Sequence, residues 1–465
     1  MLHVSDVVIV GFGNIGQALL PLLVQYYKVP VTIFEKDVTD DRVLIAQEFS
    51  SEIIRCEVTE ENYCNQLSPR LRDCTLLLNL AVSVSSLDLI SLAQERGAFY
   101  LDTCIEPWEY SHSDVGISTG NYFLREEMKS AQKNANGRRT AIVAHGANPG
   151  FISILMKKAL LEMARLNEIE SKPVSQDEWA NLAKDLDVRV IQISERDTQV
   201  SYLPRSVGEF VCTWSVDGLI TEALQPAELG WGSHEMTLPD GSVLHNYGSR
   251  AGIALAQSGR EVRVKSWSPN SLDFTGYLIT HNESLSMADY LSVLDDDGVV
   301  YRPTTYYAYH PCDDAVESME LLADGTERSV LSKRVVKSEV VSGIDELGVF
   351  LISGKYPALW YGSNLSIGRT RNIVPHNNAT SLQVVSSILA AVQWLELNPC
   401  EGILESEQLD WEFVFERAAH YWSPLICTSV QWTPTGNPCA FQFDDFLVRD
   451  SGCLFVEPIM EEEVV

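Results

Sequence analysis

A run of apolar residues that ends in three spaced glycines constrains the fold of this chain most. Residues 7–16 read Val-Val-Ile-Val-Gly-Phe-Gly-Asn-Ile-Gly, and an apolar pattern with helical spacing follows at once. The first glycine permits a tight strand-to-helix turn, the second lets a pyrophosphate approach the backbone, and the third lets the helix pack on the strand. The free N–H groups at the start of that helix would then face the phosphates. We therefore expect a dinucleotide site whose contacts are Gly11, Phe12, Gly13, Asn14, Ile15 and Gly16.

A second apolar strand, residues 31–34, follows that helix and ends in Glu35, where dinucleotide-binding folds place an acid. A carboxylate there binds the hydroxyls of the adenosine ribose and repels a 2′-phosphate. The pattern therefore indicates NAD rather than NADP, with Glu35 as a further cofactor contact. The alternative is a glycine-rich turn without a ligand. It is less favoured, because the strand, the helix and the acid all stand at their expected places.

Strands and helices alternate through the first 150 residues. Strand patterns stand at 52–58, 76–80, 98–102 and 140–143, and helical patterns begin near 40 and 59 and span 86–97 and 122–134. This alternation predicts an α/β domain over residues 1–150, a Rossmann-type doubly wound parallel sheet. Ligands of such sheets bind beyond the carboxyl ends of the strands, which selects the loops 81–85, 102–108 and 145–150. We expect Ala81, Thr103 and Asn148 in these loops to contact the cofactor.

The pattern changes after residue 150. Helical segments are now interrupted by strand-like runs at 188–193, 208–214, 262–264 and 276–280. We expect residues 151–378 to form a second, α+β substrate and dimerisation domain with a mostly antiparallel or mixed sheet. A helical run at 383–397, which begins near Ala379, opens a C-terminal segment, 379–465. We expect that segment to pack back on the Rossmann domain.

Composition narrows the classes of partner. The net charge of −30 argues against nucleic acid and would attract small cations, although solubility alone also accounts for such a charge. No apolar run approaches the length of a membrane span, and the first strand begins too early for a signal peptide. The ten cysteines include no CxxC pair and no zinc-type spacing. They therefore indicate reduced thiols in a cytoplasmic protein.

Four polar or aromatic residues of the second domain are candidates for chemistry. Glu195 follows the strand pattern 188–193 and would either point into a cleft between the domains or pair with a neighbouring arginine. Trp214 ends another strand pattern, where core packing is the commoner role, although a tryptophan that faces a cationic ligand stabilises it by about 0.5–2 kcal/mol. Glu222 follows a glycine turn and alone suggests a surface acid, and His281 alone suggests a hydrogen-bonded core histidine. These residues lack the spacing of a metal-binding helix, so we expect no catalytic metal.

Taken together, the motifs of the chain resemble those of bacterial-type homospermidine synthase over essentially its full length. The segments that carry the resemblance are 11–16, 101–108 (Leu-Asp-Thr-Cys-Ile-Glu-Pro-Trp), 146–150 (Gly-Ala-Asn-Pro-Gly), 195–199, 213–235, 280–284, 309–315, 343–348, 361–366 (Tyr-Gly-Ser-Asn-Leu-Ser) and 378–380. The resemblance implies a fold similar to that of saccharopine reductase, assembled as a homodimer.

The resemblance also implies a reaction. Putrescine is oxidised by tightly held NAD to an imine, and ammonia leaves. The amine of a second putrescine attacks, and the stored hydride reduces the new Schiff base to homospermidine. Spermidine can replace one putrescine as the aminobutyl donor. Because the net redox change is zero, such an enzyme is a transferase of polyamine biosynthesis.

The resemblance also implies roles for the four candidate residues of the second domain. Trp214 would lie against the cationic imine intermediates and stabilise them without a basic atom that could react. Glu195 or Glu222 would hold a distal ammonium group of the substrate. The reacting amine must be neutral, so carboxylates or His281 would take protons from it.

The resemblance extends to three residues elsewhere in the chain. Glu106 and Asn148, in loops after predicted strands, would meet the substrate at the carboxyl edge of the sheet. Asp345 would bind an ammonium group at an outer end of the substrate. One departure stands in the loop 81–85, where the family often carries an acid and this chain has Ser83. If Ser83 replaces that acid, one ammonium contact is weaker, and substrate preference or entry differs.

Two other functions stay open at this stage. The first is a saccharopine-type or carboxyspermidine-type dehydrogenase, which has a similar fold but turns over NAD(P)H. Its substrates carry carboxylates and call for arginines, whereas the candidates here are mostly acids and aromatics, with Arg196 the main exception. The second is a non-catalytic, NAD-binding polyamine sensor, which would bind without releasing ammonia.

Overall fold

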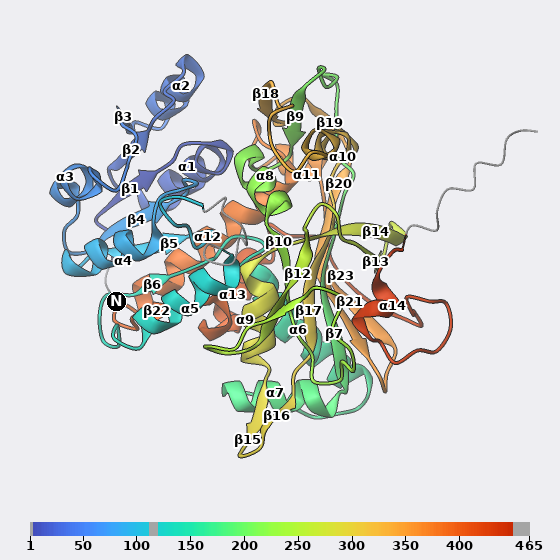
Figure 1. Cartoon of the computed structure of the whole chain (residues 1–465). Coiled ribbons are helices and arrows are strands. Elements are labelled where there is room, and N and C mark those ends of the chain that lie inside the picture. Colours follow the sequence, from blue (N-terminus) through green and yellow to red (C-terminus); the bar gives the residue numbers. More distant parts are fainter. Residues whose placement is uncertain (1–2, 111–119, 450–465) are drawn as a thin grey trace, which may run out of the picture.

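The computed structural model describes residues 3–110 and 120–449, which form two sheets with helices around and between them (Figure 1). The first sheet is built mainly from the N-terminal residues, drawn in blue and cyan, and the second from residues beyond 187. The α/β class and the presence of a second domain with a mixed sheet are confirmed.

The first sheet is parallel throughout, with strand order β22-β6-β5-β4-β1-β2-β3. Its strands are β1 (Asp6–Val10), β2 (Val31–Glu35), β3 (Glu52–Arg55), β4 (Thr75–Asn79), β5 (Phe99–Asp102), β6 (Ala141–Ile142) and β22 (Ile403–Leu404). The central strands β1 and β4 are buried along their whole length, which explains their unbroken apolar sequences. The predicted strand 52–58 is shorter than expected, because β3 lies at the edge of the sheet and ends at Arg55.

The helices of this domain connect consecutive strands. They are α1 (Asn14–Tyr27), α2 (Asp40–Glu48), α3 (Tyr63–Leu67), the 3-10 turn η1 (Ser68–Arg70), α4 (Ser86–Glu95) and α5 (Asn121–Gln132). The side chains of Thr39 and Ser85 cap α2 and α4, as expected where a loop enters a helix. The doubly wound Rossmann arrangement is therefore confirmed.

The second sheet is mixed, with strand order β11-β12-β10-β17-β7-β20-β21-β23 and the hairpin β13–β14 joined to it through β17. β17 and β7 pair in parallel, whereas their other neighbours in this sheet run antiparallel. Its strands are β7 (Val188–Asp197), β10 (Pro226–Gly230), β11 (Val243–Leu244), β12 (Gly252–Ser258), β13 (Arg263–Ser268), β14 (Leu272–Ile279), β17 (Thr304–His310), β20 (Ile344–Ser353), β21 (Ala358–Ser366) and β23 (Leu425–Val430). β7, β20 and β21 are almost fully buried and form its core.

Short strand pairs and helices surround this sheet. The pairs are β8 (Val200–Ser201) with β19 (Val340–Ser342), β9 (Glu209–Cys212) with β18 (Ser332–Val335), and β15 (Val293–Asp295) with β16 (Gly298–Tyr301). The helices are α6 (Phe151–Leu166), α7 (Gln176–Asp185), α8 (Val216–Leu224), α9 (Asn282–Tyr290), α10 (Asp313–Met319), η2 (Glu320–Leu322) and α11 (Ile367–Arg371).

Two local expectations are wrong. The strand expected to end near residue 193 continues to Asp197, so Glu195 lies within β7 and not after it. Gly218 is not a turn before Glu222, because both residues belong to α8, which Ser215 caps with its side chain.

The C-terminal segment joins both sheets. It contains α12 (Ala379–Leu397), β22, the 3-10 turn η3 (Ser406–Gln408), α13 (Trp411–Ala418), β23 and α14 (Phe443–Phe446). α12 packs against α1 and lies between the two sheets, and β22 extends the parallel sheet beside β6 (Figure 1). β23 pairs with β21 of the second sheet, so this segment does not pack on the Rossmann domain alone. The domain limits 1–150, 151–378 and 379–465 stay a prediction, and residues 450–465 lie outside the described part.

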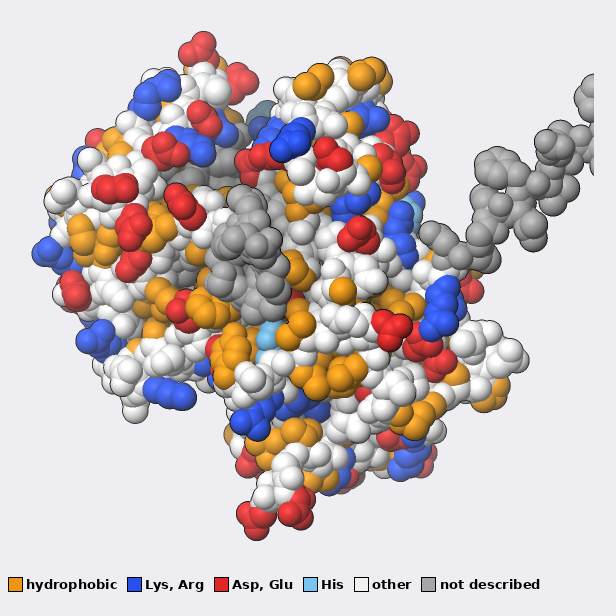
Figure 2. Space-filling model, in the orientation of Figure 1, with side chains coloured by type: hydrophobic (Ala, Val, Ile, Leu, Met, Phe, Trp, Pro, Cys, Tyr) orange, Lys and Arg blue, Asp and Glu red, His pale blue; other side chains and the backbone are white. Residues whose placement is uncertain are grey.

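No helix within residues 3–110 and 120–449 combines the length and the apolar character that a membrane crossing requires. On the face shown in Figure 2, Lys and Arg side chains are scattered among Asp and Glu and form no continuous basic band.

Candidate active site

A cavity lies between the two domains, at the carboxyl ends of the parallel strands. The loops after β4, β5 and β6 form one wall, and side chains of the second domain form the other. Nine of the predicted site residues line it: Ile15, Ala81, Thr103, Glu106, Asn148, Glu195, Trp214, Glu222 and His281. The remaining predicted residues, which are Gly11, Phe12, Gly13, Asn14, Gly16, Glu35 and Asp345, lie outside its lining.

The glycine turn has the geometry that a dinucleotide needs. Gly11 has a φ of +89°, and a Cβ there would lie 2.8 Å from the main chain at Leu80 and Ala81. A Cβ at Gly16 would lie 2.9 Å from the carbonyl oxygen of Gly11, so helix and strand approach closely. In contrast, a Cβ at Gly13 would meet nothing within 4 Å. The space over Gly13 and the unpaired N–H groups of the first turn of α1 therefore fit a pyrophosphate.

Glu35 is buried at the end of β2, beside this turn. Its carboxylate accepts hydrogen bonds from the N–H of Phe12 at 2.5 Å and the N–H of Asp37 at 2.9 Å, and Arg42 lies 3.1 Å away. The acid is thus held where an adenosine ribose would lie. The Asn14 side chain has a different role, because it donates to Ser381 Oγ of α12 and accepts from Asn377, just before that helix. Only the backbone of Asn14 is therefore free to face phosphates.

Trp214 is half-buried and lines the cavity just before α8. A Cβ at Gly218 would lie 2.7 Å from the indole ring, so the absence of a side chain at 218 lets the ring lie against the first turn of α8. The same helix carries Glu222, one turn after Gly218, to the cavity wall. The motif from 214 to 222 therefore joins an aromatic face and a carboxylate through one helix.

His281 lies between two carboxylates. Its Nε2 is 3.0 Å from Glu222, and its Nδ1 is 3.2 Å from Glu283 in the first turn of α9. Burial lowers the pKa of His281, but the charges of Glu222 and Glu283 outweigh burial and raise this pKa well above its ordinary value. Near neutral pH the imidazole is therefore in its cationic form, with a proton on each ring nitrogen, which can donate a proton. The role of His281 as a base stays a prediction.

Glu195 lies at the centre of a second polar group. Its carboxylate accepts hydrogen bonds from Asn148 Nδ2 at 3.0 Å and from the Tyr307 hydroxyl. The Tyr307 ring in turn contacts His281, with ring centroids 4.4 Å apart. Burial raises the pKa of Glu195 to about 7, although the bonds from Tyr307 and Asn148 oppose this shift. A carboxyl that titrates near neutral pH can both hold an ammonium group and exchange a proton with it.

Two further buried acids lie near Glu195, outside the cavity lining. Asp197 of β7 and Asp345 of β20 are direct partners in the strand register. Asp345 accepts a hydrogen bond from Thr380, a residue of the cavity wall at the start of α12. Burial first, and the charges of Glu195 and Asp197 next, raise the pKa of Asp345 well above its ordinary value. Burial raises the pKa of Asp197 to about 6.

Glu106 provides a carboxylate on the Rossmann side. It accepts a hydrogen bond from the N–H of Ser83 at 2.9 Å and from the hydroxyl of Tyr110 at 2.8 Å. Burial raises the pKa of Glu106 to about 7, and these two hydrogen bonds oppose the shift. Ser83 contributes its backbone, with a φ of +59°, rather than a side-chain charge.

Sequence reasoning missed four residues of this arrangement: Asp197, Glu283, Tyr307 and Thr380. The motifs 195–199, 280–284 and 378–380 contain three of them and were a usable signal. Tyr307 lies in an aromatic-rich strand whose sequence resembles a core strand, so no local pattern marks it. Arg196, the expected exception among the acids, points to Pro311 and Asp313, away from the cavity.

The lining favours cationic ligands. Among the described residues it contains Glu106, Glu195 and Glu222 beside Trp214, and neither Lys nor Arg. Buried carboxylates and an indole face stabilise ammonium and iminium groups, whereas a carboxylate ligand would find no cationic partner except His281. No group of three metal-binding side chains is found within residues 3–110 and 120–449.

Comparison with known proteins places the chain in a family. Residues 7–143 match the family model of the saccharopine dehydrogenase NADP binding domain, and residues 146–421 match that of the saccharopine dehydrogenase C-terminal domain. A homospermidine synthase of Blastochloris viridis is 42% identical over 96% of this chain and 98% of that protein. One of Mesorhizobium japonicum is 39% identical over 92% of this chain and 91% of that protein.

A solved structure agrees with these relatives. The homospermidine synthase of Legionella pneumophila, determined in complex with NAD, has a TM-score of 0.90 at 38% identity. The match covers 97% of this chain and 99% of that chain. With relatives above 30% identity over nearly its whole length, this chain belongs to the homospermidine synthase family.

Proposed function

We propose that this protein makes homospermidine from two putrescine molecules with release of ammonia, or from putrescine and spermidine, with NAD as a recycled cofactor. One observation carries the proposal. An acidic, aromatic cavity, to which the described residues contribute neither Lys nor Arg, opens at the dinucleotide edge of the Rossmann sheet, in a chain of the homospermidine synthase family. When bound, NAD supplies a reversible acceptor for the hydride of the amine carbon.

Substrate recognition rests on the cavity acids. Glu106 on the Rossmann wall, and Glu195 and Glu222 on the opposite wall, hold the ammonium groups of a diamine. Burial raises the pKa of Glu106 and of Glu195 to about 7. Each acid therefore gains by ionising against a bound cation, and diamine affinity falls as the pH drops below about 7.

Proton transfer is assigned to the Glu195 group. The reacting amine loses a proton to Glu195, which Asn148 and Tyr307 hold in place through hydrogen bonds. His281, protonated between Glu222 and Glu283, donates a proton when ammonia leaves. Trp214 lies against the cationic imine and stabilises it by about 0.5–2 kcal/mol through its ring. The indole nitrogen is not basic, so it does not compete with the substrate amine for the imine.

The rival of a saccharopine-type dehydrogenase fits the cavity less well. Its carboxylate substrates need cationic side chains, and the described lining offers none except His281.

We also propose that the protein is a cytoplasmic homodimer that binds neither nucleic acid nor membranes. The net charge of −30 supports the absence of nucleic acid, the free thiols of the described cysteines support the cytoplasm, and the homodimer rests on the family resemblance.

The decisive assay incubates the purified protein with putrescine and NAD and follows homospermidine, ammonia and reduced cofactor together. We expect one ammonia per homospermidine and no accumulation of reduced cofactor. Stoichiometric accumulation of reduced cofactor without homospermidine would instead identify a dehydrogenase. Binding of both ligands without ammonia release would identify a sensor.

A parallel incubation with NADP tests the role of Glu35. We expect at least about tenfold lower turnover with NADP, because the carboxylate of Glu35 repels the 2′-phosphate.

A further inference from the structure

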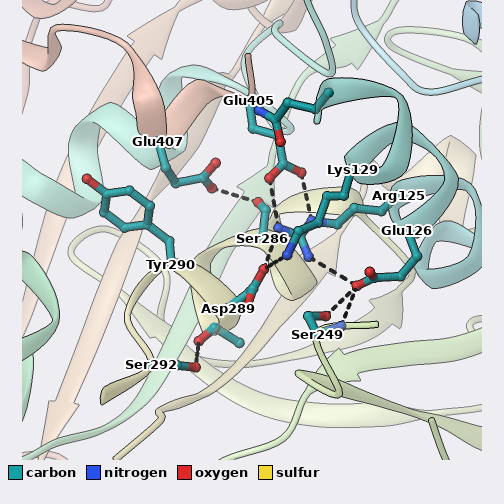
Figure 3. Close-up of polar contacts among 12 residues, drawn as sticks. Arg125, Glu126, Lys129, Ser249, Ser286, Asp289, Tyr290, Ser292, Glu405 and Glu407 are labelled. Carbon is teal, nitrogen blue, oxygen red and sulfur yellow. Dashed lines mark hydrogen bonds and ion pairs between the residues drawn. The ribbon is translucent and has the colours of Figure 1, made fainter. Parts of the chain in front are cut away.

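A buried arginine outside the cavity links the two domains. Arg125 lies on α5 of the Rossmann domain, and only 2% of its side chain is exposed. Its guanidinium binds both carboxylate oxygens of Glu405, each at 2.7 Å, and donates to Asp289 of α9 at 2.9 Å (Figure 3). Lys129, one turn further along α5, also pairs with Asp289. Three segments that are distant in sequence therefore meet at one guanidinium group.

The segment around η3 extends this link in two directions. Glu407 accepts hydrogen bonds from Ser286 of α9 at 2.6 Å and from Ser153 of α6 at 2.8 Å. Figure 3 shows Glu407 beside Ser286, next to the Arg125 group. Ser406 contacts His145 Nδ1 at 2.8 Å. His145 opens the loop that carries Asn148 to the cavity, so η3 touches both the Rossmann loop and α9.

α9 connects this network to the cavity. The helix begins at Asn282, directly after His281, and carries Glu283 in its first turn. Ser286 and Asp289 are three residues apart and therefore lie on one face of the helix. Their bonds to Glu407 and Arg125 fix the second half of α9. Because a helix moves nearly as a rigid body, fixing that half also fixes the position of His281 and Glu283.

We propose that Arg125 is a positioning residue for the reaction: it holds α9, and with it His281 and Glu283, in register with the Rossmann loops that carry Asn148 and Glu106. This inference rests on the proposed function. Arg125 is absent from the cavity lining, so it acts on the site indirectly, through its bonds to Asp289 of α9 and to Glu405. Its fork is required, since a lysine has one nitrogen and cannot bind two carboxylate oxygens of Glu405 while it reaches Asp289.

Because the cofactor is recycled, a misplaced α9 should have a measurable consequence, the release of NADH. In the productive cycle the imine waits in the cavity until a second amine attacks. If α9 shifts, water reaches the imine first. Putrescine, NAD⁺ and water then give 4-aminobutanal, ammonium, a proton and NADH, with the amine carbon oxidised by two electrons and the cofactor reduced by two. Loosening the network therefore converts synthesis into uncoupled oxidation.

The test compares Arg125→Lys with a matched control, Arg334→Lys. Arg334 also forks onto one glutamate, Glu209, and bonds a second acid, Glu339, but it lies on β18 within the second domain. For R125K we expect kcat to fall about 10- to 100-fold, since small misplacements of catalytic groups have effects of that size. We also expect NADH and 4-aminobutanal to rise from a minor to a major share of the products. R334K should retain wild-type coupling.

A second readout needs no turnover. Hydrogen exchange of the ligand-free protein should show faster exchange over 282–290 in R125K and not in R334K. If R125K does not fold, Asp289→Ala replaces it, because it removes the acceptor of the same bond on α9. Wild-type coupling together with wild-type exchange in the folded variant overturns the proposal for Arg125. A wild-type protein that makes no homospermidine overturns the proposed function instead, and the exchange experiment still decides whether Arg125 fixes α9.

Discussion

The two walls of the cavity are built in different ways. The Rossmann wall consists of short loops that follow parallel strands, so chain order determines what lies there. The opposite wall is assembled from β7, α8, β17 and α9, which are separated by long stretches of sequence. Its groups are buried side chains whose charges depend on one another, as His281 between Glu222 and Glu283 illustrates. In the proposed function the Rossmann wall serves mainly the cofactor, with Glu106 as its substrate acid, and the opposite wall serves the substrate.

The largest effect should follow from neutralising Glu195, an acid of the wall formed by the second domain. For Glu195→Gln we expect kcat/KM for putrescine to fall about 10³-fold, because the variant loses both an ammonium partner and a proton acceptor. NAD affinity should change little, since Glu195 lies on β7 of the second domain, away from the glycine turn, and a glutamine can still accept the hydrogen bond from Asn148. Steady-state kinetics and calorimetric titration with NAD measure the two properties. An equal loss of NAD affinity would show that the walls do not divide the work.

The indole face should come next. Trp214→Ala should lower turnover about 10²-fold, because the imine loses its cation–π partner and gains access to water. Trp214→Phe keeps an aromatic face and should lose less than about tenfold. Product formation and released 4-aminobutanal are measured for both. If the alanine variant turns over like the wild-type protein, Trp214 is only a packing residue.

Two glycines, one in each wall, permit a direct comparison. Gly13→Ala should weaken NAD binding about tenfold without altering stability, because its Cβ enters open space that we assign to the pyrophosphate. Gly218→Ala should leave NAD binding intact and lower kcat about tenfold, because its Cβ displaces the Trp214 ring. Titration with NAD and thermal unfolding, combined with kinetics, separate the two variants. Identical profiles for both would contradict the division between the walls.

The two walls also differ in how far sequence predicts them. The fingerprint from Gly11 to Gly16 and the acid Glu35 depend on local geometry, and the fold confirms the strand, turn and helix that they require. Chain order alone also placed Ala81, Thr103 and Asn148 near one sheet edge. Family resemblance, and not local pattern, was needed to bring the residues of the second wall together.

What sequence could not supply is the electrostatic state of these groups. His281 is in its cationic form only because Glu222 and Glu283 approach it from different helices, α8 and α9. Asp345, expected to bind an outer ammonium group, is buried outside the cavity lining and lies opposite Asp197, because β20 and β7 are paired in that register. Its role stays a prediction. Arg125 resembles an ordinary surface residue of an amphipathic helix until Glu405 and Asp289 are placed around it. Such properties arise from contacts between distant residues.

The smallest effect should appear in the pH dependence of stability and should distinguish the acids once more. Glu106 is protonated in the native protein up to about pH 7, whereas an unfolded chain ionises it near its ordinary value. Between these values the native state binds more protons, so the free energy of unfolding decreases as the pH rises. From pH 6 to pH 7 the contribution of Glu106 to this decrease is about 1 kcal/mol.

Denaturant titrations of the cofactor-free protein at these two pH values should show a smaller decrease in the free energy of unfolding for Glu106→Gln than for the wild-type protein. The exposed acid Glu412 serves as the control, because a Glu412→Gln variant should keep the wild-type slope. Equal slopes in all three proteins would mean that Glu106 is already ionised in the empty cavity, unlike Glu195 of the opposite wall, whose pKa burial raises to about 7.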